Sequence, residues 1–159
     1  MIFVSVGTQF GFDRLVRSVD EWAQDRKDVE VFAQIADGKY VPSHIAWKRR
    51  LTVDQFDERF EAADVIVSHA GMGNIIKALL GRKPIIVLPR DFALGEHRND
   101  HQSATARKLS GLEGCYFAAD TLSLQEYLGR SGKLTSPGSH RSASLDRLGG
   151  FLDAFVRSS

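Results

Sequence analysis

His69, Gly71 and Gly73 follow a short apolar run in the middle of the chain and are followed directly by Asn74. Glycines give access to backbone N–H groups, while a histidine ring and an asparagine amide can donate to phosphate oxygens. These groups can hold a pyrophosphate without a metal ion. The third glycine of a dinucleotide-binding fingerprint is absent, because Ile76 occupies its position. We therefore interpret the segment as a candidate phosphate-binding loop, and a purely structural histidine is the alternative.

Another glycine-containing loop lies near the amino terminus, with the sequence Gly7-Thr8-Gln9-Phe10-Gly11. Because it comes earlier in the chain, we call it the first loop and the His69 loop the second loop. The first loop separates an apolar run from a helical pattern. Glycine permits a tight turn there, and the dipole of the following helix favours an anion. The Gly-Lys-Ser/Thr of a P-loop is absent. The loop is therefore either an anion-binding turn or an ordinary strand-to-helix connection.

A third segment, residues 95–102, is dense in carboxylates, imidazoles and amides. Mixed donors and acceptors of this kind suit the recognition of several sugar hydroxyls. A solvated loop that caps the next helix through Asn99 or Asp100 is the alternative. Metal ligation by His97 and His101 with a neighbouring carboxylate is a weaker alternative, because the surrounding sequence gives these histidines no helical frame.

Apolar runs and amphipathic stretches alternate along the chain and must position these loops. Strands are predicted over residues 2–6, 29–35, 45–47, 64–68, 85–88 and 114–118. Helices are predicted over residues 12–23, from a cap at Thr52 or Asp54 through residue 63, and over 75–80, 104–109, 123–128 and 145–156. This alternation predicts a parallel sheet, whose ligands bind beyond the carboxyl ends of its strands. All three loops should therefore converge at one edge.

Composition restricts the class of protein. The 159 residues suit one domain, and an apolar content of 43% suffices for a core. Lys plus Arg (21) nearly equals Asp plus Glu (20), so no overall positive field attracts nucleic acid. Cys115 is the single cysteine and is expected to be a small buried hydrophobe. The amino terminus does not resemble a signal peptide and no apolar run could span a membrane, so we expect a cytoplasmic protein.

Taken in their order along the chain, the three loops resemble the C-terminal domain of glycosyltransferase family 28. The likeness runs from Met1 to about Leu128 and is most specific in VSHAGMGNIIKALLGRKPIIVLPR and GEHRNDHQSATA. It is similar in particular to the small catalytic subunits of two-chain UDP-sugar transferases, those of the dolichol-pathway UDP-GlcNAc transferase and of bacterial exopolysaccharide glucuronosyltransferase-type enzymes. The resemblance implies an α/β fold with a Rossmann-like parallel sheet flanked by helices, equivalent to the C-terminal, donor-binding half of a GT-B glycosyltransferase.

The resemblance also implies roles for individual residues. The first two loops would hold the diphosphate of the donor through Gly7, Thr8, Gln9, His69, Gly71, Gly73 and Asn74. Asp100 and Gln102 match positions that contact the hydroxyls of the donor sugar, and Pro89 and Arg90 would border the nucleoside. Family members often carry a glutamate where this chain has Lys77, and a lysine cannot accept hydrogen bonds from the ribose. Lys77 would instead reach a phosphate or lie on the solvated face of its helix.

Family chemistry implies that an acceptor hydroxyl displaces UDP from a UDP-sugar with inversion at the anomeric carbon and without a required metal ion or other cofactor. A general base must deprotonate the acceptor. This base normally lies on the other half of the cleft, and Glu96 and His97 are the candidates within this chain. Since the chain has room for one half only, we expect a membrane-associated partner subunit. That partner would bind a lipid-linked glycan acceptor and recruit the chain to the inner face of the membrane.

The expected organisation is a sugar-nucleotide-binding α/β domain over residues 1–130, followed by a linker and an amphipathic helix over 131–159. This last helix either docks on the partner or packs on its own domain. Two other functions stay open. One is a non-catalytic nucleotide-sugar-binding or regulatory subunit, which Lys77 favours, and the other is a nucleotide-binding protein unrelated to sugar transfer.

Overall fold

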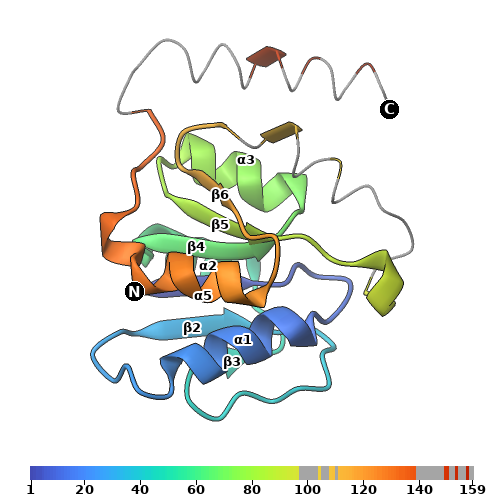
Figure 1. The fold of residues 1–159 in the computed structure, drawn as a ribbon, viewed down its shortest axis with the longest axis vertical. Helices are drawn as coiled ribbons and strands as arrows, with labels where there is room; N and C mark the ends of the chain where they lie inside the picture. The colour runs from blue at the N-terminus through green and yellow to red at the C-terminus, as the bar shows by residue number, and fades with distance from the viewer. Residues whose placement is uncertain are drawn as a thin grey trace.

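Six parallel strands form one sheet at the centre of the computed structural model, which describes residues 1–96, 104, 108–109, 111–138, 149–150, 153 and 157 (Figure 1). The strands are β1 (Ile2–Ser5), β2 (Val31–Gln34), β3 (Ala46–Lys48), β4 (Val65–His69), β5 (Ile85–Leu88) and β6 (Cys115–Phe117). Their spatial order is β3-β2-β1-β4-β5-β6, and every neighbouring pair is parallel. The order reverses between β1 and β4, which makes this the switch point where such sheets bind ligands. The predicted parallel α/β sheet is confirmed.

Helices cover both faces of the sheet. They are α1 (Asp13–Ala23), α2 (Val53–Ala62), α3 (Met72–Leu80) and α5 (Thr121–Gly129). Helices α1 and α5 lie side by side on one face, in front of the sheet in Figure 1, and α2 and α3 pack on the other. Every residue of β1, β2 and β5 is buried, which explains why these strands are continuous apolar runs rather than alternating ones.

The start of α3 corrects one expectation about the second loop. The helix was expected from residue 75, but it begins at Met72 with Gly71 as its N-cap. Gly73 and Asn74 therefore lie in its first turn rather than in the loop. Glycine has a low helix propensity, so the sequence pattern concealed this turn. Of the two alternative caps for α2, Thr52 is the one observed, in a capping box with Gln55.

Other boundaries differ less. Strand β2 is shorter than the predicted 29–35, and a 3-10 turn, η1 (Phe92–Leu94), lies in a stretch expected to be irregular. Residues 104, 108 and 109 of the predicted helix 104–109 are helical, as are residues 149, 150, 153 and 157 near the carboxyl terminus. The other residues of these two predicted helices lie outside the described part of the chain. No helix among the described residues is long and apolar enough to cross a membrane.

The segment after α5, expected to be a linker, packs on the domain up to residue 138. It begins with a second 3-10 turn, η2 (Ser131–Lys133), and Leu134 packs against the core beneath α1 and α5. The Thr135 N–H donates to the Tyr116 hydroxyl of β6 at 2.8 Å. The domain boundary at residue 130 therefore stays a prediction, because the segment on either side of it contacts the same sheet.

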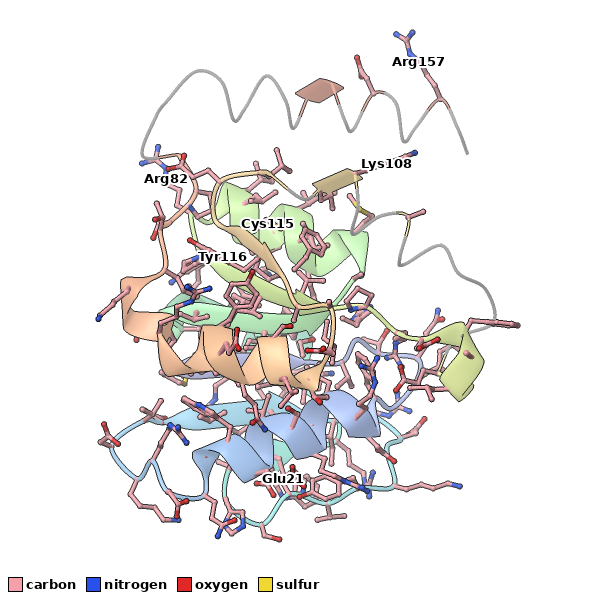
Figure 2. All side chains as sticks on the ribbon, in the orientation of Figure 1. Glu21, Arg82, Lys108, Cys115, Tyr116 and Arg157 are labelled. Atoms are coloured by element: carbon pink, nitrogen blue, oxygen red, sulfur yellow. The ribbon has the colours of Figure 1, made fainter. Side chains whose placement is uncertain are left out.

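Cys115 is a core residue, as expected. It is 8% exposed and packs beneath α2 and α3, whereas its neighbour Tyr116 packs on the opposite face of β6 (Figure 2). Burial raises the pKa of the Cys115 thiol to about 12. Since the thiolate is the nucleophilic form, this cysteine is unreactive at neutral pH.

The buried carboxylate of Asp20 holds the connection between β2 and β3. It accepts hydrogen bonds from the Tyr40 hydroxyl at 2.7 Å and from three backbone N–H groups, those of Ser43, His44 and Ile45. Burial acts to raise the pKa of Asp20, but these donors outweigh it, so the pKa lies below its ordinary value. The charged carboxylate is thus the form that the fold stabilises.

We expect Asp20→Asn to lower the free energy of unfolding by about 2–3 kcal/mol at pH 7, because an amide cannot accept all four bonds. Since the folded pKa lies below the unfolded value of about 3.9, the contribution is complete above that value and is lost as pH falls through the folded pKa. Urea unfolding from pH 7 to pH 3 measures it, with exposed Asp25→Asn as the control. If the difference in stability between the wild type and Asp20→Asn does not shrink as the pH falls, the charge of Asp20 is unimportant for stability.

Candidate functional site

The loops after β1 and β4 meet at the switch point, and the His69 ring lies between them. An added Cβ at Gly7 would lie 2.8 Å from His69 Cε1, and one at Gly71 would lie 2.2 Å from His69 Nε2. Gly7 also has a φ of +85°, which L side chains rarely adopt. The two glycines therefore form a slot that only their lack of side chains keeps open. The structure brings these three predicted site residues together.

A buried polar network beneath this slot fixes its walls. The Asn74 side chain donates from Nδ2 to Ser5 Oγ at 3.1 Å and to Ser68 Oγ at 2.8 Å. The Ser68 hydroxyl donates to Ser5 O at 3.0 Å and lies 3.5 Å from His69 Nδ1. Both amide hydrogens of Asn74 are thus used within the protein. The structure places this side chain as a brace between β1, β4 and α3.

The same network orients the His69 ring. Because the only hydrogen of the Ser68 hydroxyl goes to Ser5 O, Ser68 Oγ can act toward His69 Nδ1 only as an acceptor. The contact therefore requires a proton on Nδ1. The opposite nitrogen, Nε2, lies beside Gly71, and a ring that carries both protons can donate from it to an anion.

The amino terminus of α3 points backbone donors at the same place. Its first intrahelical hydrogen bond runs from the Ile75 N–H to Gly71 O at 3.3 Å, so the N–H groups of Met72, Gly73 and Asn74 have no intrahelical acceptor. An added Cβ at Gly73 would meet no atom within 4 Å. The described part of the chain therefore gives no steric reason for a glycine there, whereas a ligand approaching the backbone would give one.

Thr8 and Gln9 lie in the first loop and are exposed. Their N–H groups make no hydrogen bond to the described part of the chain. A cavity of about 620 Å³ opens on the α1 side of this loop, with Phe10, Arg14 and Leu94 among its lining residues. The amides of Thr8 and Gln9 can therefore donate to a polar ligand, whereas the cavity lies apart from the His69 slot, since neither His69 nor Gly71 lines it.

Arg90 is buried, and Glu96 is partly buried beside it. Arg90 is 3% exposed and donates to backbone carbonyls of the first loop. Burial lowers the pKa of Arg90, and the nearby Glu96 carboxylate opposes this shift. The Glu96 carboxylate forms a two-pronged ion pair with Arg14, at 2.8 and 2.9 Å, and accepts from the Asp91 N–H. Both of its oxygens are therefore occupied, so it is poorly placed to act as a general base.

Three other predicted site residues, His97, Asp100 and Gln102, lie outside the described residues. Across residues 1–96, 111–138 and the other described positions, no group of three or more His, Cys, Asp or Glu side chains is arranged to hold a metal ion. The described half of the site is therefore made of backbone amides, His69 and the polar network beneath it.

Lys77 forms an ion pair with Asp57 of α2, and its Nζ lies 5.2 Å from the ring centroid of Phe56 and 5.1 Å from that of Phe60. Its side chain is 36% exposed. The lysine thus joins α3 to α2 in a partly solvated position. Of the two expected places for Lys77, the structure shows the helix face rather than the phosphate loop.

We expect Lys77→Glu to lower the free energy of unfolding by about 1 kcal/mol, because it loses the ion pair and the contacts with both rings and places a carboxylate against Asp57. Adding Asp57→Lys should recover part of this loss by reversing the pair. Urea unfolding of the two single variants and the double variant measures the coupling. If the double variant is no more stable than the two single changes added together predict, the Lys77–Asp57 pair does not stabilise the fold.

Two functional residues were missed from the sequence, Ser5 and Ser68. A signal existed, because each serine is the polar residue near the carboxyl end of an otherwise apolar run, and the two are register partners in β1 and β4. Arg50, which donates to Thr8 O at 3.3 Å, was also missed. Nothing local in the sequence marks an arginine after β3 as a contact of the loop after β1.

Residues 1–132 match the family described as the glycosyltransferase family 28 C-terminal domain. No curated protein matches the sequence significantly. The fold is similar to the solution structure of ALG13, with a TM-score of 0.64 and 21% identity over 92% of this chain and 93% of that chain.

Two longer proteins also share the fold. They are the glycotransferase of kitacinnamycin (TM-score 0.61, 21% identity, 94% of this chain) and CalG4, the calicheamicin glycosyltransferase (TM-score 0.59, 15% identity, 92% of this chain). This chain spans 37% of the first and 36% of the second. These likenesses confirm the expected fold, that of the C-terminal half of a GT-B glycosyltransferase. With a family match over residues 1–132, the chain belongs to the glycosyltransferase family 28 C-terminal domain family.

Proposed function

We propose that this chain is the donor-binding subunit of an inverting glycosyltransferase that transfers a sugar from a UDP-sugar to a polyprenyl-diphosphate-linked glycan in exopolysaccharide or related glycan synthesis. The observation that carries the proposal is the His69 slot between Gly7 and Gly71, beside the amino terminus of α3 at the switch point. Open parallel sheets bind phosphate-containing ligands at such a place.

The described donors suit the chemistry of the leaving group. When the bond from the anomeric carbon to the diphosphate breaks, negative charge develops on the diphosphate oxygens. Fixed N–H groups stabilise such charge well because they need no reorganisation during the reaction. The amides of Thr8, Gln9 and Gly73 are donors of this kind, and His69 Nε2 joins them when the ring carries both protons. We therefore propose that no metal ion or other cofactor is required.

The partner subunit belongs to the same proposal. The chain spans little more than a third of two transferases that share its fold, and we propose that a second, membrane-associated chain supplies an acceptor half. Phe10, Phe92 and Leu94 are 44%, 57% and 62% exposed and follow β1 or β5, at the edge that holds the His69 slot. Exposed apolar side chains grouped beside a site are typical of a surface that another protein covers.

The general base is assigned to that partner. Both Glu96 oxygens are engaged by Arg14 and the Asp91 N–H, which leaves His97 as the candidate within this chain. We propose that the partner holds the lipid-linked acceptor, supplies the base and recruits this otherwise cytoplasmic chain to the inner face of the membrane.

A non-catalytic nucleotide-sugar-binding or regulatory subunit is the second candidate, favoured by Lys77. Co-purification with a membrane-associated partner, followed by transfer assays with a panel of UDP-sugars and a polyprenyl-diphosphate acceptor, separates the two. The transferase proposal predicts turnover that His69→Ala abolishes while the complex stays assembled. A complex that binds UDP but transfers no sugar would support the regulatory subunit instead.

A further inference from the structure

Arg90, which follows β5, holds the first loop from beneath. Its Nη2 donates to Val6 O at 2.8 Å and to Phe10 O at 2.9 Å. Its Nη1 donates to Gly11 O at 2.6 Å. The guanidinium also lies 4.7 Å from the ring centroid of Phe12, the residue that joins the loop to α1. One buried side chain thus contacts both ends of the loop.

Arg50, which follows β3, holds the middle of the same loop. Its Nη1 donates to Thr8 O at 3.3 Å. Its Nη2 pairs with both carboxylate oxygens of Asp37, at 2.9 and 2.8 Å, which orients the guanidinium. Asp37 is itself fixed, because the next residue, Gly38, packs against the backbone of Gly11. We call Arg50 and Arg90 together the arginine clamp.

The clamp determines which way the loop amides face. In a planar trans peptide unit the C=O and the following N–H point in opposite directions. Thr8 O accepts from Arg50, which follows β3, so we expect the Gln9 N–H to point away from β2 and β3. In the strand order β3-β2-β1-β4, the direction away from β2 and β3 leads to the β4 loop, where His69 and Gly71 lie.

We propose that Arg50 and Arg90 are positioning residues, which turn the carbonyls of the first loop away from the cleft and present the Gln9 N–H to the diphosphate of the donor. This inference rests on the proposed function, because it assigns the arginines to the diphosphate part of that site. Neither arginine needs to touch the ligand. The 3% exposure of Arg90 agrees with a role exerted through the loop.

Titration calorimetry with UDP, uridine and inorganic pyrophosphate tests the clamp. Arg50 is the variant of choice, because its side chain is 60% exposed and its loss leaves the core intact. We expect Arg50→Ala to bind UDP and pyrophosphate about fivefold more weakly, the effect of one misdirected hydrogen bond, and to bind uridine as the wild type does. Arg50→Lys, which keeps one donor, should recover part of the loss. We expect Arg90→Lys to lose about tenfold or more, because an ammonium cannot reach three carbonyls at once.

Arg49→Ala is the matched control. Arg49 is the exposed neighbour of Arg50 and donates to Ala36 O and Gly38 O, which belong to the β2–β3 connection rather than to the first loop. We expect this variant to bind pyrophosphate as the wild type does. Amide NMR adds a direct readout, in which pyrophosphate shifts the Gln9 N–H resonance of the wild type and shifts it less in Arg50→Ala.

The outcomes separate the two proposals. If Arg50→Ala binds pyrophosphate like Arg49→Ala, or weakens uridine as much as UDP, the clamp is overturned while the donor site stands. If the wild type binds UDP no more tightly than pyrophosphate, the proposed function fails. The clamp is then tested only by the effect of the arginine variants on pyrophosphate binding. If the wild type binds neither UDP nor pyrophosphate, alone or with a partner, both proposals fail.

Discussion

Alanine at position 71 is expected to weaken UDP binding roughly ten- to hundredfold while the fold stays intact. Its Cβ would lie 2.2 Å from His69 Nε2 and 2.7 Å from Cε1, so the ring must leave the slot. The neighbouring atoms belong to a side chain that can rotate, which spares the fold. The expected loss of UDP affinity corresponds to one hydrogen bond from His69 to a charged phosphate. Titration with UDP and urea unfolding of the same sample measure the two effects separately.

Gly73→Ala is the control for Gly71→Ala. An added Cβ there meets no protein atom, and the residue lies within α3, so alanine should leave the stability unchanged or raise it by up to about 1 kcal/mol. Any fall in its UDP affinity then reports a ligand close to the backbone. His69→Ala should reproduce the loss seen with Gly71→Ala. If Gly71→Ala and His69→Ala both bind UDP like the wild type, the slot is not the phosphate site.

Gly11→Ala is expected to lower the free energy of unfolding by about 3 kcal/mol. An added Cβ would lie 2.3 Å from Gly38 Cα and 2.4 Å from Gly38 N. These are backbone atoms of the connection between β2 and β3, which cannot rotate away, so two loops must separate. Overpacking of this kind costs about 1–3 kcal/mol and occasionally more. Urea unfolding gives the stability directly, and UDP binding should fall with it because the first loop moves.

Gly129→Ala is the matched control for Gly11→Ala. Gly129 ends α5, and nothing lies within 4 Å of an added Cβ there. Its substitution should leave the unfolding midpoint unchanged or raise it slightly. Equal midpoints for Gly11→Ala and the wild type would mean that the two loops do not pack as closely as described.

Much of this site follows from the sequence because parallel topology brings strand ends together. The apolar runs 2–6 and 64–68 were sufficient to place Gly7 and His69 at one sheet edge, and the β1–β4 switch point confirms that edge. Fold class and loop convergence are therefore properties of pattern and topology.

The interior of the site could not be predicted in the same way. The expectation that Arg90 borders the nucleoside stays a prediction, and the sequence did not indicate that its side chain lies beneath a loop 80 residues away, at Phe10. A contact at that separation depends on the packed geometry of η1 and α1, which no local pattern encodes. The contact between Gly11 and Gly38 is similar, because a glycine required by a distant backbone looks like an ordinary turn glycine.

The central claim is a UDP-sugar donor site at the carboxyl edge of the sheet, and UDP titration tests it most directly. The chain alone and its co-purified complex with a membrane-associated partner are each titrated with UDP, with His69→Ala alongside. We expect saturable binding of one UDP per chain in at least the complex, weakened roughly ten- to hundredfold in the variant. If UDP binds neither the chain nor the complex, the donor-site assignment is wrong.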